Sequence, residues 1–372
     1  MNFEYSDEQQ QLANSLRKYL AQSYGFEQRK AILQSAGGSS AQAWAALAEM
    51  GLTAIALPEV DGGFGGGAME LMAVMEACGE ALVVEPLLDH VGLAARLVAR
   101  AGSDAQRAEL LPGAIDGSSV MTLAYLEPGQ RYELVPRSTT ARAEGGGWVL
   151  DGAKCVVVGA PLASRLLVSA RTGDGVSLFV VDPRVAGVSL NPYRTVDGQR
   201  AADLRFAGVR LGADALLGPA GAALPLLDEA VDFATALLCA DAIGAMQFAN
   251  ETTLEYLKTR KQFGVPIASF QVLQHRMVEM FIHTEQARSM AILAASKVDT
   301  ATDAAERQRA VSAAKLKIAD AARLVSQESV QLHGGMGMTE ELKISHTFRR
   351  LTMIAQRFGD ADHHLERYAA LD

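Results

Sequence analysis

The sequence predicts a mainly α-helical protein with a central β domain. Apolar residues recur at helical spacing near the N-terminus, short β-prone runs separated by glycine follow in the middle, and long helical periods return toward the C-terminus. We therefore expect three parts in chain order, covering residues 1–118, 119–220 and 221–372. A chain of 372 residues is long enough for two or three hydrophobic cores.

The first part is expected to consist of helices. Ser6, followed by Asp7 and Glu8, is typical of a capped helix start with acidic residues in the first turn. Five glycines within residues 61–67 predict a loop. Apolar residues at helical spacing predict helices over residues 41–50, 69–81 and 94–110.

The middle part is expected to be a small antiparallel sheet or barrel. Its β-prone runs are residues 121–125, 148–150, 154–158, 165–169 and 177–181. Turn signals separate these runs at residues 145–147, 151–152 and 173–175, and the Asp151-Gly152 step is a strong one.

The last part is expected to be a helical bundle. Helical periods cover residues 224–256, 271–297 and 303–332, and a final helix begins at Ala361. Helices of this length can pack against one another as a bundle.

Composition excludes several classes of protein. The formal charge of −9 argues against a general nucleic-acid binder, which normally carries a basic face. The N-terminus lacks the pattern of a signal peptide, and no window approaches 18 uninterrupted apolar residues, so we expect no membrane span. Cys78, Cys155 and Cys239 are far apart in apolar runs, as expected for reduced thiols of a cytoplasmic protein, and no Cys/His spacing predicts a metal site.

Two segments break the long helices in a way that suits a pyrophosphate. The first runs from Thr259 to Gln271, and the second runs from Gln331 to Met338. The arginine in the first offers forked donors to phosphate oxygens, and the glycines let backbone N–H groups approach an anion. Taken singly, such an arginine is most often a solvated surface residue, and a glycine pair between helices is most often a turn.

In order along the chain, these segments resemble the acyl-CoA dehydrogenase family. Residues 44–52, 57–59 and 62–65 resemble its first domain, and the two helix breaks resemble its flavin-binding signature. The resemblance implies a helical domain, a middle β barrel and a C-terminal four-helix bundle, assembled as tetramers with flavin adenine dinucleotide (FAD) at a subunit boundary. The residues that it assigns to the adenosine and pyrophosphate are Arg260, Gln262, Phe263, Ile267, Phe270, Gln271, Gln331, Gly334 and Gly335.

The sequence departs from the family where the chemistry is expected. Family members remove the α-proton of an acyl-CoA with a carboxylate base while the flavin takes the β-hydride. By resemblance, Phe358 stands at the usual position of the base, and Ala234, followed by Thr235, stands at the alternative position on an earlier helix. A phenyl ring cannot accept a proton, so the catalytic residues stay unknown. The nearby carboxylates that are candidates for a substitute base are Asp232, Asp241 and Asp360.

The β domain departs from the family as well. The loop that touches flavin and thioester in the family keeps Glu127-Pro128 here but loses its small hydroxyl residues. On the strand that covers the flavin ring, Val156 and Val158 replace an aromatic wall and a hydroxyl donor.

The pattern of kept and lost residues predicts a subunit of an FAD-dependent acyl-CoA dehydrogenase, an oxidoreductase that introduces an α,β double bond into an acyl-CoA thioester. This chain would supply part of the FAD site to a homologous catalytic partner in a heterotetramer. With its ending at residues 357–367, it resembles the small subunits of heteromeric enzymes of the pimeloyl-CoA and steroid side-chain type. The family implies an electron-transfer flavoprotein as electron acceptor. The alternatives are a self-sufficient homotetramer with an unusual base and a scaffold or regulatory subunit without flavin.

Overall fold

The structure is a computed structural model that describes residues 5–173 and 175–371. The chain forms two compact units that interleave along the sequence. The first combines Met1–Arg29, Ala68–Val83 and Thr235–Asp372, and the second combines Lys30–Gly67 and Val84–Ala234. Because these units group segments distant in sequence, the predicted division into three consecutive parts stays a prediction.

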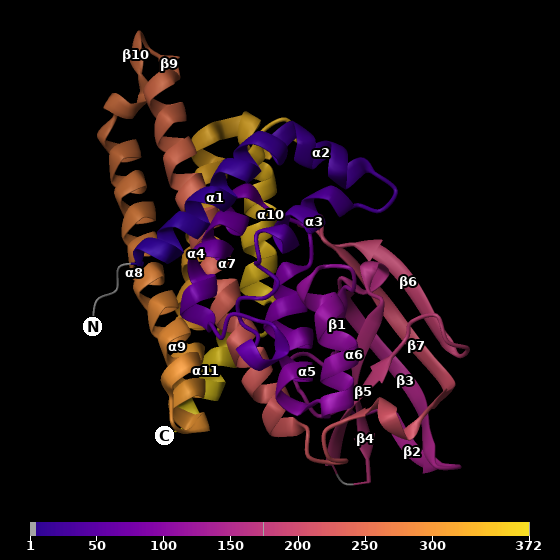
Figure 1. Ribbon diagram of the computed structural model, residues 1–372. Helices are drawn as coiled ribbons and strands as arrows, with labels where there is room; N and C mark the ends of the chain where they lie inside the picture. The colour runs from indigo at the N-terminus through magenta and orange to yellow at the C-terminus, as the bar shows by residue number, and fades with distance from the viewer. Residues whose placement is uncertain (1–4, 174, 372) are drawn as a thin grey trace. The chain divides into compact units, whose positions relative to one another are not determined.

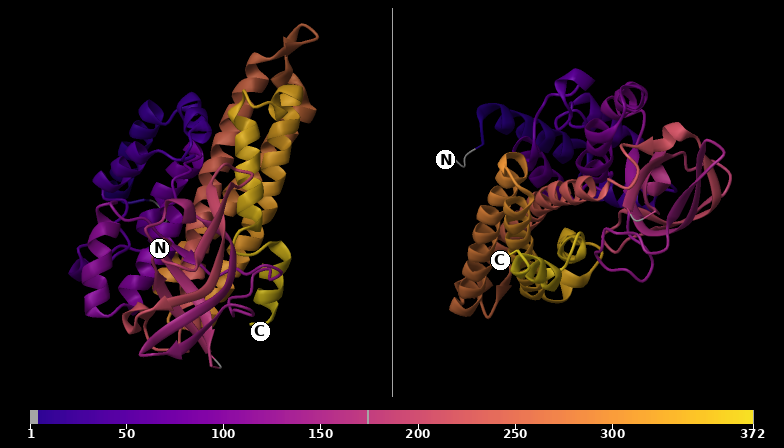
Figure 2. Two further views of the ribbon diagram at one scale, coloured as in Figure 1. Left: turned by 90° about the vertical axis from the view of Figure 1, so that its right-hand side faces the viewer. Right: turned by 90° about the horizontal axis from the view of Figure 1, so that it is seen from below.

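The first unit is a bundle of long helices. The central one is α9 (Ala304–His333), because α8 (Gln271–Thr300), α10 (Lys343–Gln356) and α11 (Ala361–Ala369) all pack against it. The helix α7 (Leu224–Thr259) begins in the second unit and contributes residues 235–259 to this bundle. Figures 1 and 2 show the long helices of the bundle side by side.

A helix from the N-terminal part, α4 (Ala68–Ala81), touches α7 backbone to backbone. A Cβ atom at Gly79 would lie 1.9 Å from the carbonyl oxygen of Asp241, and one at Gly244 would lie 1.8 Å from that of Glu76. Only glycine permits so close an approach.

Two buried carboxylates flank this contact and tie it to other helices. Glu76 accepts a hydrogen bond from the Tyr5 hydroxyl at 2.7 Å and pairs with Arg288 of α8 at 3.0 Å. Asp241 pairs with Arg350 of α10 at 3.4 Å, and both side chains are almost fully buried. The α4–α7 contact therefore sets the positions of α8 and α10.

The second unit is built around an eight-stranded sheet with the order β6-β7-β3-β2-β4-β5-β8, in which β1 also pairs with β4. The strands are β1 (Met121–Ala124), β2 (Thr140–Glu144), β3 (Gly147–Val158), β4 (Arg165–Thr172), β5 (Gly175–Val181), β6 (Val188–Arg194), β7 (Arg200–Leu211) and β8 (Leu216–Leu217). A buried cluster of alanine, valine, leucine and phenylalanine side chains forms its core. The helices are α3 (Ala41–Glu49), a π-helical stretch over Leu88–Ala95, α5 (Arg96–Ala101) and α6 (Asp104–Ile115), while α2 (Phe26–Gln34) crosses the boundary between the units.

The observed elements confirm the predicted class, mainly α with a central β domain. The predicted capped start is present, because Ser6 caps α1 (Asp7–Ser23) and the Gln9 side chain bonds back to the Ser6 N–H. The predicted final helix from Ala361 is also present, but it has only nine residues.

Several local predictions are wrong. Asp151-Gly152 is not a turn but lies inside β3, where a register shift joins the two predicted runs into one strand. Residues 94–110 do not form one helix, because Gly102 ends α5 and Ser103 caps α6. The sheet is not purely antiparallel, since β4 pairs in parallel with β1 and β2.

The helix α10 is absent from the sequence prediction. Its buried residues include Ser345, His346, Thr347 and Arg350 beside the aliphatic ones. Its aliphatic residues Ile344, Leu351 and Ile354 nevertheless recur at helical spacing, so the pattern that indicates a helix was present in the sequence.

In the described part of the chain, α7 is the one helix long and apolar enough to cross a membrane, judged by length and composition. In the structure, 83% of its most apolar window is buried. This burial fits a core helix of the bundle.

A buried ion pair holds the loop between β1 and β2. Lys154 Nζ lies 3.1 Å from Glu127 Oε1, and both side chains are at most 1% exposed. The carboxylate also accepts hydrogen bonds from the backbone N–H groups of Arg137, Ser138 and Thr139. Burial raises the pKa of Glu127, but the hydrogen bonds and the Lys154 ammonium outweigh it and lower the pKa to about 2.

The glycine contact between α4 and α7 can be tested with Gly244→Ala. The added methyl group forces the two backbones apart, so we expect a loss of about 2 kcal/mol or more in the free energy of unfolding. This exceeds the roughly 1 kcal/mol by which alanine favours a helix over glycine. Denaturant unfolding followed by circular dichroism measures the change. The control is Gly37→Ala, where the nearest atom is 3.8 Å away and we expect less than about 0.5 kcal/mol. Equal stability of both variants would contradict a tight contact.

The pH dependence of unfolding tests the role of Glu127. Its pKa in the folded state lies below the ordinary value of 4.5, so its charge contributes stability above that pH, which is lost as the pH falls toward 2. The full contribution is about 3 kcal/mol, at ~1.4 kcal/mol for each pH unit. We expect the stability of Glu127→Gln to fall less steeply than that of wild type between pH 4.5 and 2. Parallel curves would show that the charge of Glu127 contributes nothing.

Candidate functional site

The first predicted segment forms a hairpin that projects from one end of the bundle (Figure 1). It joins α7 to α8 through two short antiparallel strands, β9 (Lys261–Gln262) and β10 (Val265–Pro266). Phe263 and Gly264 both have positive φ, 53° and 81°, as the tightest hairpin loops require. We call residues 260–271 the α7–α8 hairpin.

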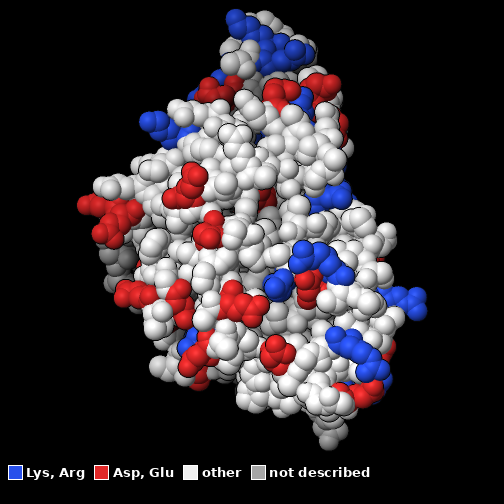
Figure 3. Space-filling model, turned by 45° about the vertical axis from the view of Figure 1, so that its right-hand side comes forward, with Lys and Arg blue, Asp and Glu red and all other residues white. Residues whose placement is uncertain are grey.

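The side chains that the sequence assigns to flavin are mostly open to solvent. Within the described residues, no side chain pairs with the Arg260 guanidinium or bonds to the amide of Gln271. Phe263 is 91% exposed and meets the ring of Phe270 edge-on at 6.1 Å. Gln262 is exposed and Ile267 half-buried. Lysine and arginine side chains gather at the upper tip of the molecule in Figure 3, and the exposed ones at this hairpin are Lys258, Arg260 and Lys261.

The second predicted segment lies at the same end of the bundle. After the exposed Gln331, residues Gly334–Met338 form a 3-10 turn that leads to α10. The His333 ring stacks on Tyr256, with centroids 4.5 Å apart, and Tyr256 lies one helical turn before Arg260. This stack links the glycine segment to the part of α7 that carries the arginine. A Cβ atom at Gly334 or Gly335 would meet nothing within 4 Å, so their backbone faces open space.

An apolar groove of about 440 Å³ lies between α7 and α8, next to the hairpin. Its lining includes Leu254, Met277 and Phe281. The exposed apolar side chains of α8 extend this surface, with Val272 67% and Phe281 59% exposed. We call these exposed side chains the α8 apolar face, which consists of Val272, Val278, Phe281 and Ile282.

Phe358 lies on a tight turn between α10 and α11. It is 7% exposed and has a φ of 60°, a left-handed conformation that non-glycine residues rarely adopt. The Arg357 guanidinium lies 4.6 Å from the centroid of the Phe358 ring. The structure thus presents an apolar ring where the resemblance expects a base.

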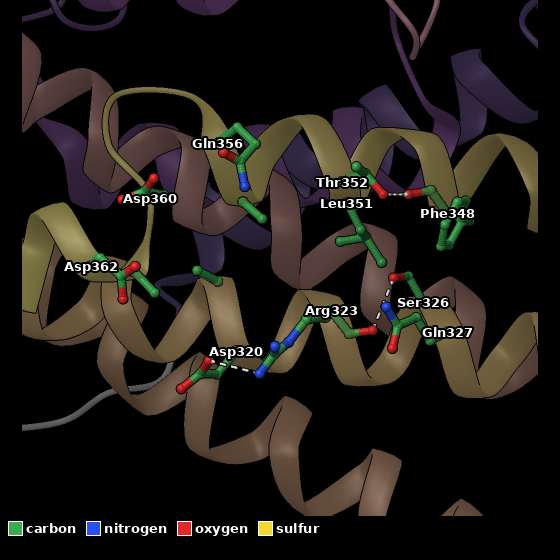
Figure 4. A pocket seen from close by; sticks show the side chains of 13 residues that line it. Asp320, Arg323, Ser326, Gln327, Phe348, Leu351, Thr352, Gln356, Asp360 and Asp362 are labelled. Atoms are coloured by element: carbon green, nitrogen blue, oxygen red, sulfur yellow. Dashed lines mark hydrogen bonds and ion pairs between the residues drawn. The ribbon is translucent and has the colours of Figure 1, made fainter. Parts of the chain in front are cut away.

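A groove of about 480 Å³ opens beside this turn, between α9 and α10 (Figure 4). Three carboxylates line it, from Asp320, Asp360 and Asp362, against one guanidinium, Arg323, which lies 3.5 Å from Asp320. Gln356 points into it from α10. The excess of negative charge favours hydrogen-bond donors or cations over a phosphate.

In the second unit, Val156 occupies an irregular position on β3. It has a φ of 52°, which is a genuine outlier for a β-branched residue, and it is 41% exposed. Its backbone N–H donates to Asp203 Oδ1 at 3.1 Å, and the Tyr193 hydroxyl donates to the same oxygen at 2.8 Å. Val158 is 6% exposed and offers only a methyl surface. The backbone at Val156 is thus fixed by a hydrogen bond to Asp203, and the side chain that it presents cannot donate a hydrogen bond to a flavin.

Two of the candidate substitute bases already bind other groups of the chain. Asp241 pairs with Arg350, and Asp360 caps α11 by accepting a hydrogen bond from the His363 N–H at 2.9 Å. Asp232 is 1% exposed. Thr235 is buried as well, and Ala234 has no titratable group. Across residues 5–173 and 175–371, no cluster of three or more histidine, cysteine or carboxylate side chains is arranged to hold a metal ion.

Several residues that support these positions are invisible to sequence reasoning. Positive φ at non-glycine residues occurs, within the described chain, at Leu82, Val156, Phe263 and Phe358. Three of these four coincide with positions that the family resemblance assigns to flavin or base. Backbone strain concentrates at functional sites, so these positive φ values mark the three positions as candidates for a functional role. One of the supporting residues could have been found in the sequence: Lys315 interrupts the apolar stripe of α9, which indicates a buried charge.

The described residues fit one half of a flavin site. A free guanidinium, exposed amides and open glycine backbone at one end of the bundle suit a pyrophosphate that arrives from outside the chain. The other half, which would hold a flavin ring through Val156 and Val158, lacks an aromatic wall and a donor.

The chain is similar to known proteins over nearly its whole length. Models of the N-terminal, middle and C-terminal domains of acyl-CoA dehydrogenases match residues 6–118, 122–209 and 224–370. The acyl-CoA dehydrogenase FadE12 of Mycobacterium tuberculosis is 32% identical over 95% of this chain and 93% of its own length. The human mitochondrial short-chain specific acyl-CoA dehydrogenase is 29% identical over 86% of this chain and 81% of its own length.

Two solved structures are similar over nearly the whole chain. A variant of the Tcur3481-Tcur3483 steroid acyl-CoA dehydrogenase is 31% identical, with a TM-score of 0.89, and covers 98% of this chain and 97% of its own. The ChsE4-ChsE5 complex from Mycobacterium tuberculosis is 26% identical, with a TM-score of 0.91, and covers 100% and 98%. Since three domain models in order and a relative above 30% identity span the chain, this protein belongs to the acyl-CoA dehydrogenase family of FAD-dependent oxidoreductases that act on CH–CH groups.

Proposed function

We propose that this chain is the subunit without a catalytic base in a mixed acyl-CoA dehydrogenase complex. The complex introduces an α,β double bond into an acyl-CoA thioester. A homologous partner subunit supplies the carboxylate base, and this chain supplies the outer half of the partner's FAD site. Electrons leave through an electron-transfer flavoprotein, by analogy with the family, and the complex works in the cytoplasm.

The observation that carries the proposal is the residue at position 358. A buried phenyl ring stands on the turn that the family uses for its base, and alanine stands at the alternative position. General-base catalysis needs a side chain that accepts a proton within hydrogen-bond reach. Neither position offers one, which supports a base supplied by another chain.

The α7–α8 hairpin supports the second part of the proposal. Arg260, Gln271 and Gln331 would donate hydrogen bonds to the pyrophosphate of FAD, and the backbone of Gly334 and Gly335 would come close to it. The groove under the hairpin offers an apolar surface to a flat ring. FAD supplies hydride acceptance when bound, and the protein supplies orientation.

The self-sufficient homotetramer is disfavoured by the surroundings of its candidate bases. Asp241 stabilises the contact between α7 and α10 through Arg350, and Asp360 caps a helix. A carboxylate committed to an ion pair or a helix N-terminus is held in its charged form and is a poor proton acceptor. The acidic groove beside Phe358 also opposes a pyrophosphate near this turn.

The surface of α8 supports assembly with another chain. Its apolar face is large for an exposed surface and continues the apolar groove beside the hairpin. Two similar solved structures are named for two different proteins each, Tcur3481-Tcur3483 and ChsE4-ChsE5. The first is named a steroid enzyme, which makes steroid side-chain CoA thioesters the first substrates to test.

A scaffold without flavin is the remaining candidate. The retained and unpaired Arg260 is the observation against it, because a long cation held at a helix break with no partner in the described chain suits an external anion.

The chain on its own is expected to have little dehydrogenase activity. Loss of general-base catalysis lowers rates by about 10²–10⁴-fold. The measurement is reduction of an artificial electron acceptor with straight-chain, branched and steroid side-chain acyl-CoA substrates. The comparison is the complex captured from its native host through a tag on this chain. Turnover by the chain alone that matches the native complex would contradict the proposal, and loss of that turnover in Asp360→Asn would point to a substitute base.

Arg260→Ala is expected to weaken FAD retention in the mixed complex by about tenfold or more. Charge-assisted hydrogen bonds contribute roughly 1.5–3 kcal/mol, and ~1.4 kcal/mol is tenfold in affinity. Arg260→Lys should restore part of the loss, because an ammonium keeps the charge but not the fork. FAD content per complex after dialysis is the readout, with assembly checked by size-exclusion chromatography.

The matched control for Arg260→Ala is Lys258→Ala. It removes one positive charge from the same basic tip, where Lys258 pairs with Glu255 at 2.7 Å. We expect its FAD content to stay close to wild type. Full FAD content in an intact Arg260→Ala complex would reduce Arg260 to a surface residue and remove the main support for a shared site.

A further inference from the structure

Two side chains with no assigned role hydrogen-bond to the backbone of the turn that carries Phe358. Lys315, on α9, is completely buried, and its Nζ donates hydrogen bonds to the carbonyl oxygens of Gly359 at 2.6 Å and Ala355 at 3.2 Å. His364, on α11, is 1% exposed, and its Nε2 lies 3.1 Å from the Phe358 carbonyl oxygen. Three carbonyl groups of one turn are thus bound by side chains from two other helices.

The turn needs such support for two reasons. The last carbonyl groups of a helix have no partner within the helix, and that of Ala355 is only partly open to water. The backbone is also strained, because Phe358 has a φ of 60°. Gly359, with a φ of 123°, cannot be replaced, since a Cβ atom there would lie 2.5 Å from His364 Nε2.

The chemistry of Lys315 argues against a passive role. It interrupts the apolar stripe formed on α9 by Val311, Ile318 and Ala322. Burial lowers its pKa to about 8, while Cys239 and Asp360 oppose that shift, so the amine is still mostly protonated at neutral pH. A buried cation is costly unless it is hydrogen-bonded, and a methionine would fill the space without that cost.

The His364 ring is fixed in one tautomer by its neighbours. Burial lowers its pKa to about 2, so the ring is neutral. If Nε2 donates to the Phe358 carbonyl, Nδ1 is left to accept from the Ser312 hydroxyl, which lies 3.3 Å away on α9, one turn before Lys315. The same face of α9 therefore supports the turn directly through Lys315 and indirectly through Ser312.

We propose that Lys315 and His364 are positioning residues that hold residues 355–360 in one conformation, so that the side chain at position 358 points in a fixed direction. In this chain they hold a phenyl ring as a rigid apolar wall. Only the functional meaning of the direction in which residue 358 points rests on the proposed function. The hydrogen bonds from Lys315 and His364 are a property of the chain alone.

Hydrogen–deuterium exchange of the full chain tests this support. The amides of Arg357 and Gly359 donate to the carbonyls of Met353 and Gln356, and they report opening of the turn. We expect Lys315→Met to speed their exchange tenfold or more, and Lys315→Gln, which keeps two N–H donors, to have a smaller effect. Lys317→Met makes the same chemical change two residues along α9, outside these contacts, and should leave exchange unchanged. Unchanged exchange in folded Lys315→Met would overturn the proposal.

A second pair of variants covers the case in which Lys315→Met does not fold. His364→Gln should also speed exchange at Gly359, whereas the same change at His275, an exposed residue of α8, should not. A 4-fluorophenylalanine at position 358 provides a spectroscopic signature, because its single fluorine resonance should split or broaden in His364→Gln only. One sharp resonance in both variants would overturn the proposal. Neither measurement needs flavin or substrate, so failure here is distinct from failure of the subunit proposal.

Discussion

The backbone contact between α4 and α7 is the constraint on which the first unit depends. Gly79 and Gly244 remove the side chains that would separate the two helices. The carboxylates that flank the contact then reach Arg288 on α8 and Arg350 on α10. The contact therefore links the helices that carry the hairpin and the Phe358 turn, although it lies in neither the hairpin nor the turn.

Strained backbone that carries apolar side chains is common to two positions of the candidate site. Val156 and Phe358 occupy conformations that cost free energy, and each is held by polar side chains committed to it. Such conformations are kept where geometry matters. The structure fixes the backbone at these two positions, and the side chains that it presents there have no acid–base chemistry.

The sequence allowed the fold class to be predicted, since long helical periods and separated β-prone runs are local signals. The flavin-binding role of the two helix breaks stays a prediction. The prediction of a turn at Asp151-Gly152 was wrong, because β3 pairs with β7 on both sides of this step and takes up the extra residue as an irregularity in register. The prediction missed α10 although Ile344, Leu351 and Ile354 lie there at helical spacing. It could not reveal that Lys315 binds the carbonyls of Ala355 and Gly359, because residues some forty positions apart meet only after the bundle forms.

The exposed α8 apolar face and the nearly bare Phe263 have a consequence for the life of the chain in a cell. A newly made chain without a bound partner exposes this apolar surface, which makes it prone to aggregation and a target for chaperones and proteases. Its abundance is then governed by the supply of whatever covers that surface. In the proposed mixed complex, balanced synthesis of the two subunits would keep the uncovered chain from accumulating.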